Sequence, residues 1–296
     1  DNGIGVTNEL NFTASGELDN GYTWSYSMEL DPSTDDSGAA RNDDTQVSLG
    51  MGDLGTLKVC VSECGNNKKY AWDQSAYTSM SDTGISEGIT YPDDMGSYAS
   101  IQYHTPELPL GITASIAHGN QKTDGQSGNS TATSGDSATE YSVVIKPVDG
   151  LTLSGSYMEK NSYGDGTDHD QNEENGAYAA SYSAGNISVG YGKSFKAPEA
   201  TAITAGATTA EYYENTGVSL AYAINDNVSV SYTEETAEKN MQTSSTTTYD
   251  IETDSIQVAY SLGGGTLSLA RADYENYNHV QNHDATETII ALAFAF

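Results

Sequence analysis

The stretch that decides the fold is YTWSYSMEL, residues 22–30. Aromatic and aliphatic side chains occupy every second position, and Thr, Ser and Glu stand between them. A period of two predicts a β-strand with one apolar and one polar face, because successive side chains of a strand point to opposite sides. Residues 10–14 show the same alternation, and Asp-Asn-Gly at residues 19–21 indicates a tight hairpin turn between the two segments.

The alternation recurs about fifteen times, and no helical periodicity is visible. Tight turns alternate with long polar connections along the chain. This alternation places all the long connections at one end of the sheet. Transmembrane β-barrels sort short turns and long loops in this way, and apolar rows of about nine to eleven residues suit a tilted strand that crosses a bilayer. The expected long connections are residues 31–43, 61–96, 119–138, 160–175, 196–213, 233–250 and 274–284.

Composition excludes several classes of protein. The 296 residues carry 42 acidic and 11 basic side chains, a net charge of −31 that opposes binding to nucleic acid. No run of 18 apolar residues provides a membrane-spanning helix. High charge with 36% hydrophobic residues is also typical of disorder, but 21 Tyr and the regular alternation oppose that interpretation.

Two other architectures remain alternatives. A secreted or surface β-sandwich that binds a ligand would also alternate, although it has little reason to sort its connections by length. A barrel enzyme of the outer membrane is the third hypothesis. The sequence has no phosphate-binding loop, and no histidine has a serine or cysteine partner at a recognisable spacing. We therefore expect no catalysis and no catalytic residues.

The two cysteines, Cys60 and Cys64, are four residues apart and have no zinc-site spacing around them. In an exported protein a short disulfide loop that fixes a local bend is expected, with free thiols as the alternative.

Several segments, in order and spacing, resemble the general porin family of alphaproteobacterial and related outer membranes. They are GMGDLGTL at residues 50–57, SIQYHTP at 100–106 and the alternating C-terminal segment 290–296, which ends on an aromatic residue. The resemblance covers most of the chain. It implies a single all-β domain over residues 1–296: a 16-stranded transmembrane antiparallel barrel, usually trimeric, with a long third loop folded inward. It also implies residence in the bacterial outer membrane, among its lipids and lipopolysaccharide, and passive diffusion of ions and small hydrophilic solutes.

The resemblance leaves one discrepancy. Fifteen strands can be counted, and the long loop follows the fourth of them, whereas in the family it follows the fifth. A strand before Asp1 would resolve both differences; a miscount, or closure through one parallel pair, is the alternative.

The connection over residues 61–96 is too long to lack a role, so we expect it to be the constriction loop, with an exposed loop as the alternative. Its candidate constriction residues are Glu63, Asp73, Asp82, Glu87, Asp93 and Asp94. The alternation along the strands adds pore-wall candidates, because side chains between the lipid-facing ones point into the barrel. They are Glu17, Glu29, Asp44 and Lys58.

Almost no predicted wall residue is basic, which departs from the basic wall that opposes the acidic loop in well-known porins. A narrow carboxylate-lined passage concentrates cations, so the sequence predicts cation preference; the alternative is that the charge mainly solvates outer loops. We expect no cofactor, although Asp165, Asp168 and Asp170 could bind calcium through hard oxygen ligands.

Overall fold

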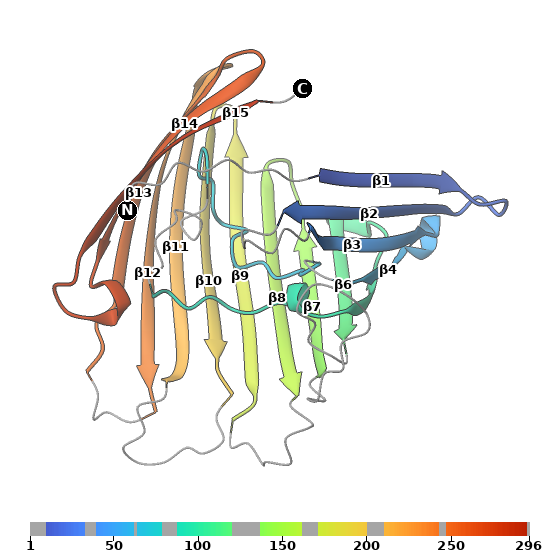
Figure 1. The fold of residues 1–296 in the computed structure, drawn as a ribbon, viewed down its shortest axis with the longest axis horizontal. Helices are drawn as coiled ribbons and strands as arrows, with labels where there is room; N and C mark the ends of the chain where they lie inside the picture. Colours follow the sequence, from blue (N-terminus) through green and yellow to red (C-terminus); the bar gives the residue numbers. More distant parts are fainter. Residues whose placement is uncertain are drawn as a thin grey trace.

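The computed structural model describes residues 10–32, 40–61, 64–78, 88–119, 137–161, 171–199, 210–242 and 247–294. Within these residues, fifteen strands form one antiparallel sheet in which every strand pairs with its neighbours in the sequence (Figure 1). In chain order they are β1 (Leu10–Glu17), β2 (Thr23–Pro32), β3 (Ala40–Gly50), β4 (Thr56–Cys60), β5 (Ser100–His104), β6 (Ile112–Gly119), β7 (Ser137–Ile145), β8 (Leu151–Asn161), β9 (Glu173–Ala184), β10 (Ile187–Ala197), β11 (Ala210–Asn225), β12 (Val228–Met241), β13 (Ile251–Ser261), β14 (Gly265–Glu275) and β15 (Ala285–Phe294).

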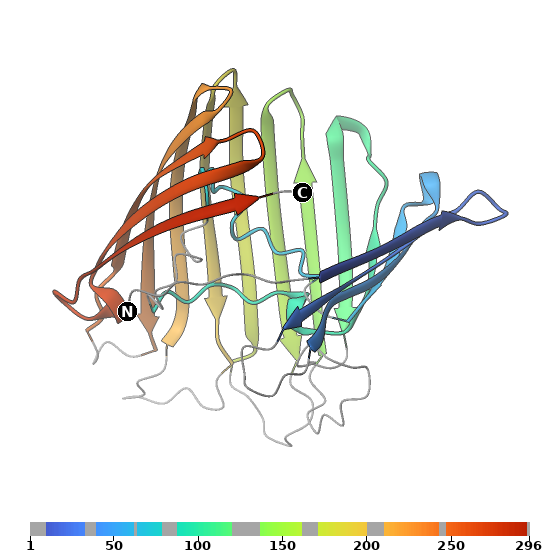
Figure 2. The same ribbon diagram turned by 45° about the horizontal axis from the view of Figure 1, so that its top comes forward.

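The sheet is a curved wall that does not close. Figure 2 shows β1 and β15 at its two free edges, and no ladder joins these two strands in the described residues. The all-β antiparallel fold and the count of fifteen strands agree with the sequence prediction. Within the described residues the sheet has fifteen strands and is not closed into a barrel, and the sixteenth strand expected before Asp1 stays a prediction.

Some strands extend into the segments expected to be loops. β11 begins at Ala210 and β12 ends at Met241, so both reach well beyond the predicted boundaries at residues 213 and 233. β2 and β3 likewise leave only residues 33–39 between them. The added part of β12 is polar, and the apolar criterion therefore missed it, but the ladder needs only backbone partners: Glu234 and Glu235 pair with Asp254 and Thr253.

The convex face of the wall, here called the outer face, is apolar and exposed. Leu269 on β14 and Ile290 on β15 are cross-strand partners, and Ile290 is 73% exposed. The large exposed apolar side chains on the outer face include Leu57, Val59, Ile101, Val143, Val189, Val218, Leu220, Ile256, Leu267, Leu269, Ile290 and Leu292. An apolar band with exposed tyrosines, such as Tyr141, Tyr182, Tyr222 and Tyr260, is typical of a surface that faces lipid.

Aromatic rings cover glycines on this outer face. Trp24 lies over its cross-strand partner Gly16, where an added β-carbon would be 2.8 Å from the indole nitrogen. Phe195 covers Gly176 in the same way. Each ring shields the backbone that a glycine leaves bare, a packing known to stabilise glycines in strands.

The concave face, here called the inner face, carries the polar set of side chains. Much of it is buried under the connection between β4 and β5, which lies across it in Figures 1 and 2. A small apolar cluster forms at the start of β7 from Met95, Tyr98, Ala117, Ala138 and Met158. The helices of the described residues are short 3-10 turns, and none is long and apolar enough to span a membrane.

Candidate pore constriction

The connection between β4 and β5 folds onto the inner face, as the sequence predicts, and its described residues form two legs. The outgoing leg, residues 64–78, crosses the wall from β5 to β13. Its backbone N–H groups donate to side chains of the wall, so this part of the docking does not depend on which side chains the leg carries. The bonds are Asn66 to Glu140 Oε2 (3.1 Å), Lys68 to Ser156 Oγ (2.9 Å), Gln74 to Ser219 Oγ (2.9 Å), Ala76 to Ser231 Oγ (2.8 Å), and Tyr77 and Thr78 to Gln257 Oε1 (3.0 Å each).

The return leg, residues 88–99, runs back along the wall to β5. Its wall contacts are Thr90 O with Asn215 Nδ2 (3.0 Å), the Tyr91 hydroxyl with Glu235 Oε2 (2.8 Å), Asp93 N with Asn175 Oδ1 (2.8 Å) and Met95 N with Glu140 Oε2 (3.3 Å). The two legs also hold each other, because Lys69 Nζ donates to Pro92 O at 3.0 Å and the rings of Tyr70 and Tyr91 meet edge to face at 5.2 Å. The loop is therefore a ribbon fixed to the wall over most of its described length.

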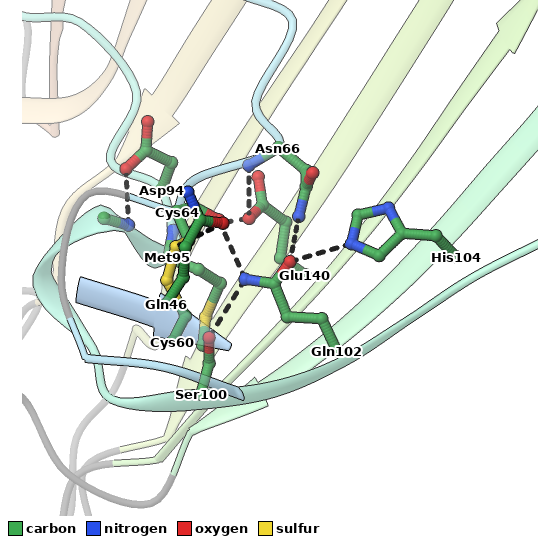
Figure 3. The surroundings of a disulfide bond; sticks show 11 residues. Gln46, Cys60, Cys64, Asn66, Asp94, Met95, Ser100, Gln102, His104 and Glu140 are labelled. Carbon is green, nitrogen blue, oxygen red and sulfur yellow. Dashed lines mark hydrogen bonds between the residues drawn. A yellow bond between two sulfur atoms is a disulfide. The ribbon is translucent and has the colours of Figure 1, made fainter. Parts of the chain in front are cut away.

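A disulfide between Cys60 and Cys64 closes the base of the ribbon, with the two Cα atoms 6.2 Å apart (Figure 3). Beside it, Gln102 of β5 donates from Nε2 to Cys64 O at 2.8 Å and accepts from Asn66 Nδ2 at 3.1 Å. Glu140 of β7 is 1% exposed, and the same oxygen accepts a backbone N–H from each leg. One buried carboxylate thus joins the two ends of the loop.

Three of the six candidate constriction residues lie in the described part of the loop, and each has a partner. Asp93 Oδ2 is 2.8 Å from Lys196 Nζ, and Asp94 Oδ2 is 3.8 Å from Lys69 Nζ. Asp73 accepts from the Ser75 hydroxyl at 2.6 Å. Burial raises the pKa of Asp73, and hydrogen bonds from Ser75 and Ser219 act against that rise. The other three candidates, Glu63, Asp82 and Glu87, lie outside the described residues.

Two basic residues that the sequence did not point to, Lys68 and His104, join the predicted wall residue Lys58 at the base of the loop. Lys58 points to the inner face, as parity predicts, since its cross-strand partners are Ser48 and Gln102. Lys68 of the outgoing leg and His104 of β5 lie close enough that both lysines act electrostatically on the imidazole. Burial lowers the pKa of Lys68, against the opposing effect of the Glu140 carboxylate. Only the docking of the loop brings these three residues together.

The remaining wall candidates are less informative. Glu17 and Glu29 lie on β1 and β2 with the predicted alternation, opposite Thr23 and Asn11. The ladder between β2 and β3 shifts register after Ser27, and the side chain of Asp44 lies outside the described residues. More deeply buried inner-face carboxylates that parity did not single out are Glu140, Glu173 and Glu235.

Calcium binding has no support in the described part of the chain, where no three His, Cys, Asp or Glu side chains are grouped to hold a metal ion. The predicted calcium ligands, Asp165, Asp168 and Asp170, lie outside the described residues, and that site stays a prediction.

An antiparallel wall with a lipid-compatible outer face and a loop docked on a polar inner face defines the class: an outer-membrane channel of the β-barrel type. Sequence comparison agrees, because the description "Gram-negative porin" matches residues 1–280. The chain belongs to the Gram-negative porin family and resides in the bacterial outer membrane. Family and fold indicate a channel rather than an enzyme.

The fold is also similar to solved porin structures. A porin refined at 1.8 Å is 14% identical with a TM-score of 0.64, and the match covers 97% of this chain and 92% of that one. A mutant of the Rh. blastica porin is 12% identical with a TM-score of 0.61, covering 97% and 89%. Outer-membrane expressed OmpT of Vibrio cholerae is 9% identical with a TM-score of 0.60, over the same shares. No curated protein matches the chain in sequence.

Proposed function

We propose that this protein is a passive pore that prefers cations and passes ions and small hydrophilic solutes. The observation that carries the proposal is the ribbon of residues 64–78 and 88–99 on the inner face, which takes up part of the space on the concave side of the wall. A loop held largely by its backbone leaves other side chains, such as that of Asp93, to face the passage. Diffusion through such a passage needs no catalytic group.

The balance of charge supports cation preference. The inner face and the loop together present Asp73, Asp93 and Asp94, and behind them the wall carboxylates Glu140, Glu173 and Glu235. Lysines neutralise part of this charge, since Lys196 meets Asp93 and Glu173, and Lys160 meets Glu173. The side chain of Asp93 is nevertheless 50% exposed, so its charge still acts on passing ions. Net negative charge beside a low-dielectric wall attracts cations and repels anions.

The basic group of Lys58, Lys68 and His104 gives the passage a second feature. It lies at the base of the loop, where Lys68 is in electrostatic contact with the buried carboxylate of Glu140 and where Asp94 also lies, next to Gly65. Acidic and basic groups are therefore close together at this end of the loop. Cation preference then depends on the acidic groups outweighing this local positive charge.

The test is the reversal potential of the purified protein in a planar bilayer that separates two KCl concentrations. The expected sign is that of a cation-selective pore, and neutralising Asp93 (Asp93→Asn) is expected to reduce it. Glu252→Gln is the matched control, because Glu252 is exposed on the outer face of β13, opposite the face on which the described part of the loop lies. Anion selectivity would contradict the preference, and a protein that inserts without conducting would contradict the pore.

Assembly as a homotrimer embedded among outer-membrane lipids and lipopolysaccharide belongs to the same proposal. Its support is the family and the broad apolar outer face, which a neighbouring subunit or lipid must cover. Chemical cross-linking in native outer membranes tests it; a ladder that stops at the dimer would contradict the trimer.

A further inference from the structure

Trp72 is the side chain that packs the middle of the outgoing leg against the wall. This residue is 4% exposed and is one of two tryptophans in the chain. Its indole Nε1 donates to the carbonyl of Lys69 at 2.9 Å, so the polar atom of the ring is satisfied within the loop itself. The remaining surface of the ring is free to pack against the wall.

The surface beneath Trp72 is made of glycines. Gly192 of β10 and Gly217 of β11 are direct cross-strand partners on the inner face, and Gly190 follows at the next position of the same parity. A β-carbon at Gly192 or Gly217 would overlap the indole ring, and one at Gly190 would overlap the backbone carbonyl of Trp72. These three glycines, here called the glycine slot, leave a recess whose depth suits the thickness of a ring.

Glycine in the interior of a strand weakens the strand, so its presence at three neighbouring inner-face positions needs a local reason. A close approach by another part of the chain is such a reason, and Trp72 provides it. Polar side chains border the slot and continue the docking: Ser219 accepts from Gln74 N at 2.9 Å, and the hydroxyls of Ser75 and Thr233 are 3.1 Å apart. Trp72 therefore sits where the apolar contact and the polar bonds of the outgoing leg meet.

We propose that Trp72 and the glycine slot set the position of the constriction loop and, through it, the width of the pore. This inference rests on the proposed pore function. Trp72 acts as a positioning residue and does not touch the solute, since the ring faces the wall. Removing the ring, or filling the slot, releases the middle of the outgoing leg and makes the loop mobile, while the sheet keeps its ladders.

Single-channel recording in planar bilayers tests the proposal. Trp72→Ala and Gly192→Ala are both expected to raise the conductance, to add fluctuations to the open level and to admit larger uncharged polymers. Gly155→Ala is the matched control and is expected to behave as wild type, because a β-carbon there lies 3.6 Å from its nearest neighbour, an ordinary contact. Trp72→Phe, which keeps a flat ring, is expected to restore most of the wild-type behaviour.

The double variant separates direct contact from general disturbance of the strand. When the indole is absent, a methyl group at residue 192 has nothing to displace, so Gly192→Ala is expected to change conductance much less in the Trp72→Ala background than alone. Equal and additive effects would overturn the proposal, and so would a Trp72→Ala barrel that conducts as wild type.

Fluorescence provides a measurement that does not require any variant of the loop or slot to fold. In Trp24→Phe protein, Trp72 is the sole tryptophan, and we expect blue-shifted emission that acrylamide barely quenches. Efficient quenching by acrylamide would contradict the burial of Trp72 against the wall. This arm does not involve conduction, so a protein that fails to conduct would contradict the proposed function while the quenching result still decides the position of Trp72.

Discussion

The buried carboxylate of Glu140 is expected to control how firmly the base of the constriction loop is held. Glu140→Ala removes the one oxygen that accepts from both Asn66 N (3.1 Å) and Met95 N (3.3 Å). A buried donor left without a partner costs about 1–3 kcal/mol, so the two together predict a loss of about 2–6 kcal/mol in the free energy of local opening. Since about 1.4 kcal/mol corresponds to a factor of ten, amide protection should fall by at least about 30-fold.

The assay is hydrogen exchange followed by mass spectrometry in detergent micelles, on peptides that contain residues 66 and 95. Glu140→Gln keeps an acceptor oxygen and is expected to lose less protection than the alanine variant. Glu252→Ala removes an exposed carboxylate from the other face of the sheet and should leave both peptides unchanged. Unchanged exchange at both peptides in Glu140→Ala would refute the claim that this carboxylate holds the two legs.

Three further outcomes are expected. Replacing Cys60 and Cys64 by serine should lower stability by about 2 kcal/mol, the entropic value for a loop this short, and would be read from denaturant unfolding of reduced and oxidised protein. Because burial raises the pKa of Asp73, its carboxyl takes up a proton at a higher pH than free aspartate does, so cation selectivity should decline on acidification, and Asp73→Asn should weaken that decline in reversal-potential titrations. An arginine at Leu220, 47% exposed in the apolar band, should destabilise the folded protein by about 2–4 kcal/mol in lipid refolding assays, whereas Leu220→Ile should not.

The fold was predictable because its signal is local. A period of two, a hairpin turn and the regular sorting of connections by length are visible in residues 10–30 and repeat along the chain. The ends of β11 and β12 were not predictable from apolar alternation, since Glu234 and Glu235 belong to strands through backbone pairing alone. Counting strands in the sequence also does not predict whether the sheet closes, because closure depends on how the two edge strands, β1 and β15, meet.

The site was predictable only in outline. Length and charge drew attention to residues 61–96, but the partners of each loop residue depend on the register between loop and wall, which no short-range pattern encodes. Lys68 and His104 join Lys58 only after docking. One signal in the sequence could have pointed to the site. Gly190, Gly192 and Gly217 lie on the inner face of neighbouring strands, and glycine in a strand often marks a place where another part of the backbone comes close. Nothing in the sequence says that Trp72 is what approaches.

The hydrogen bonds of the outgoing leg have a consequence for how this pore can diversify. The loop contributes backbone N–H groups, and the wall contributes side-chain oxygens such as those of Ser219, Ser231 and Gln257. A change of side chain on the loop leaves these backbone donors intact, whereas a change on the wall deletes an acceptor. Trp72 is the exception, because its ring takes part in the docking. Side chains of residues 64–78 can therefore change, and the solute preference of the pore with them, while the wall keeps the acceptors that hold the loop in place.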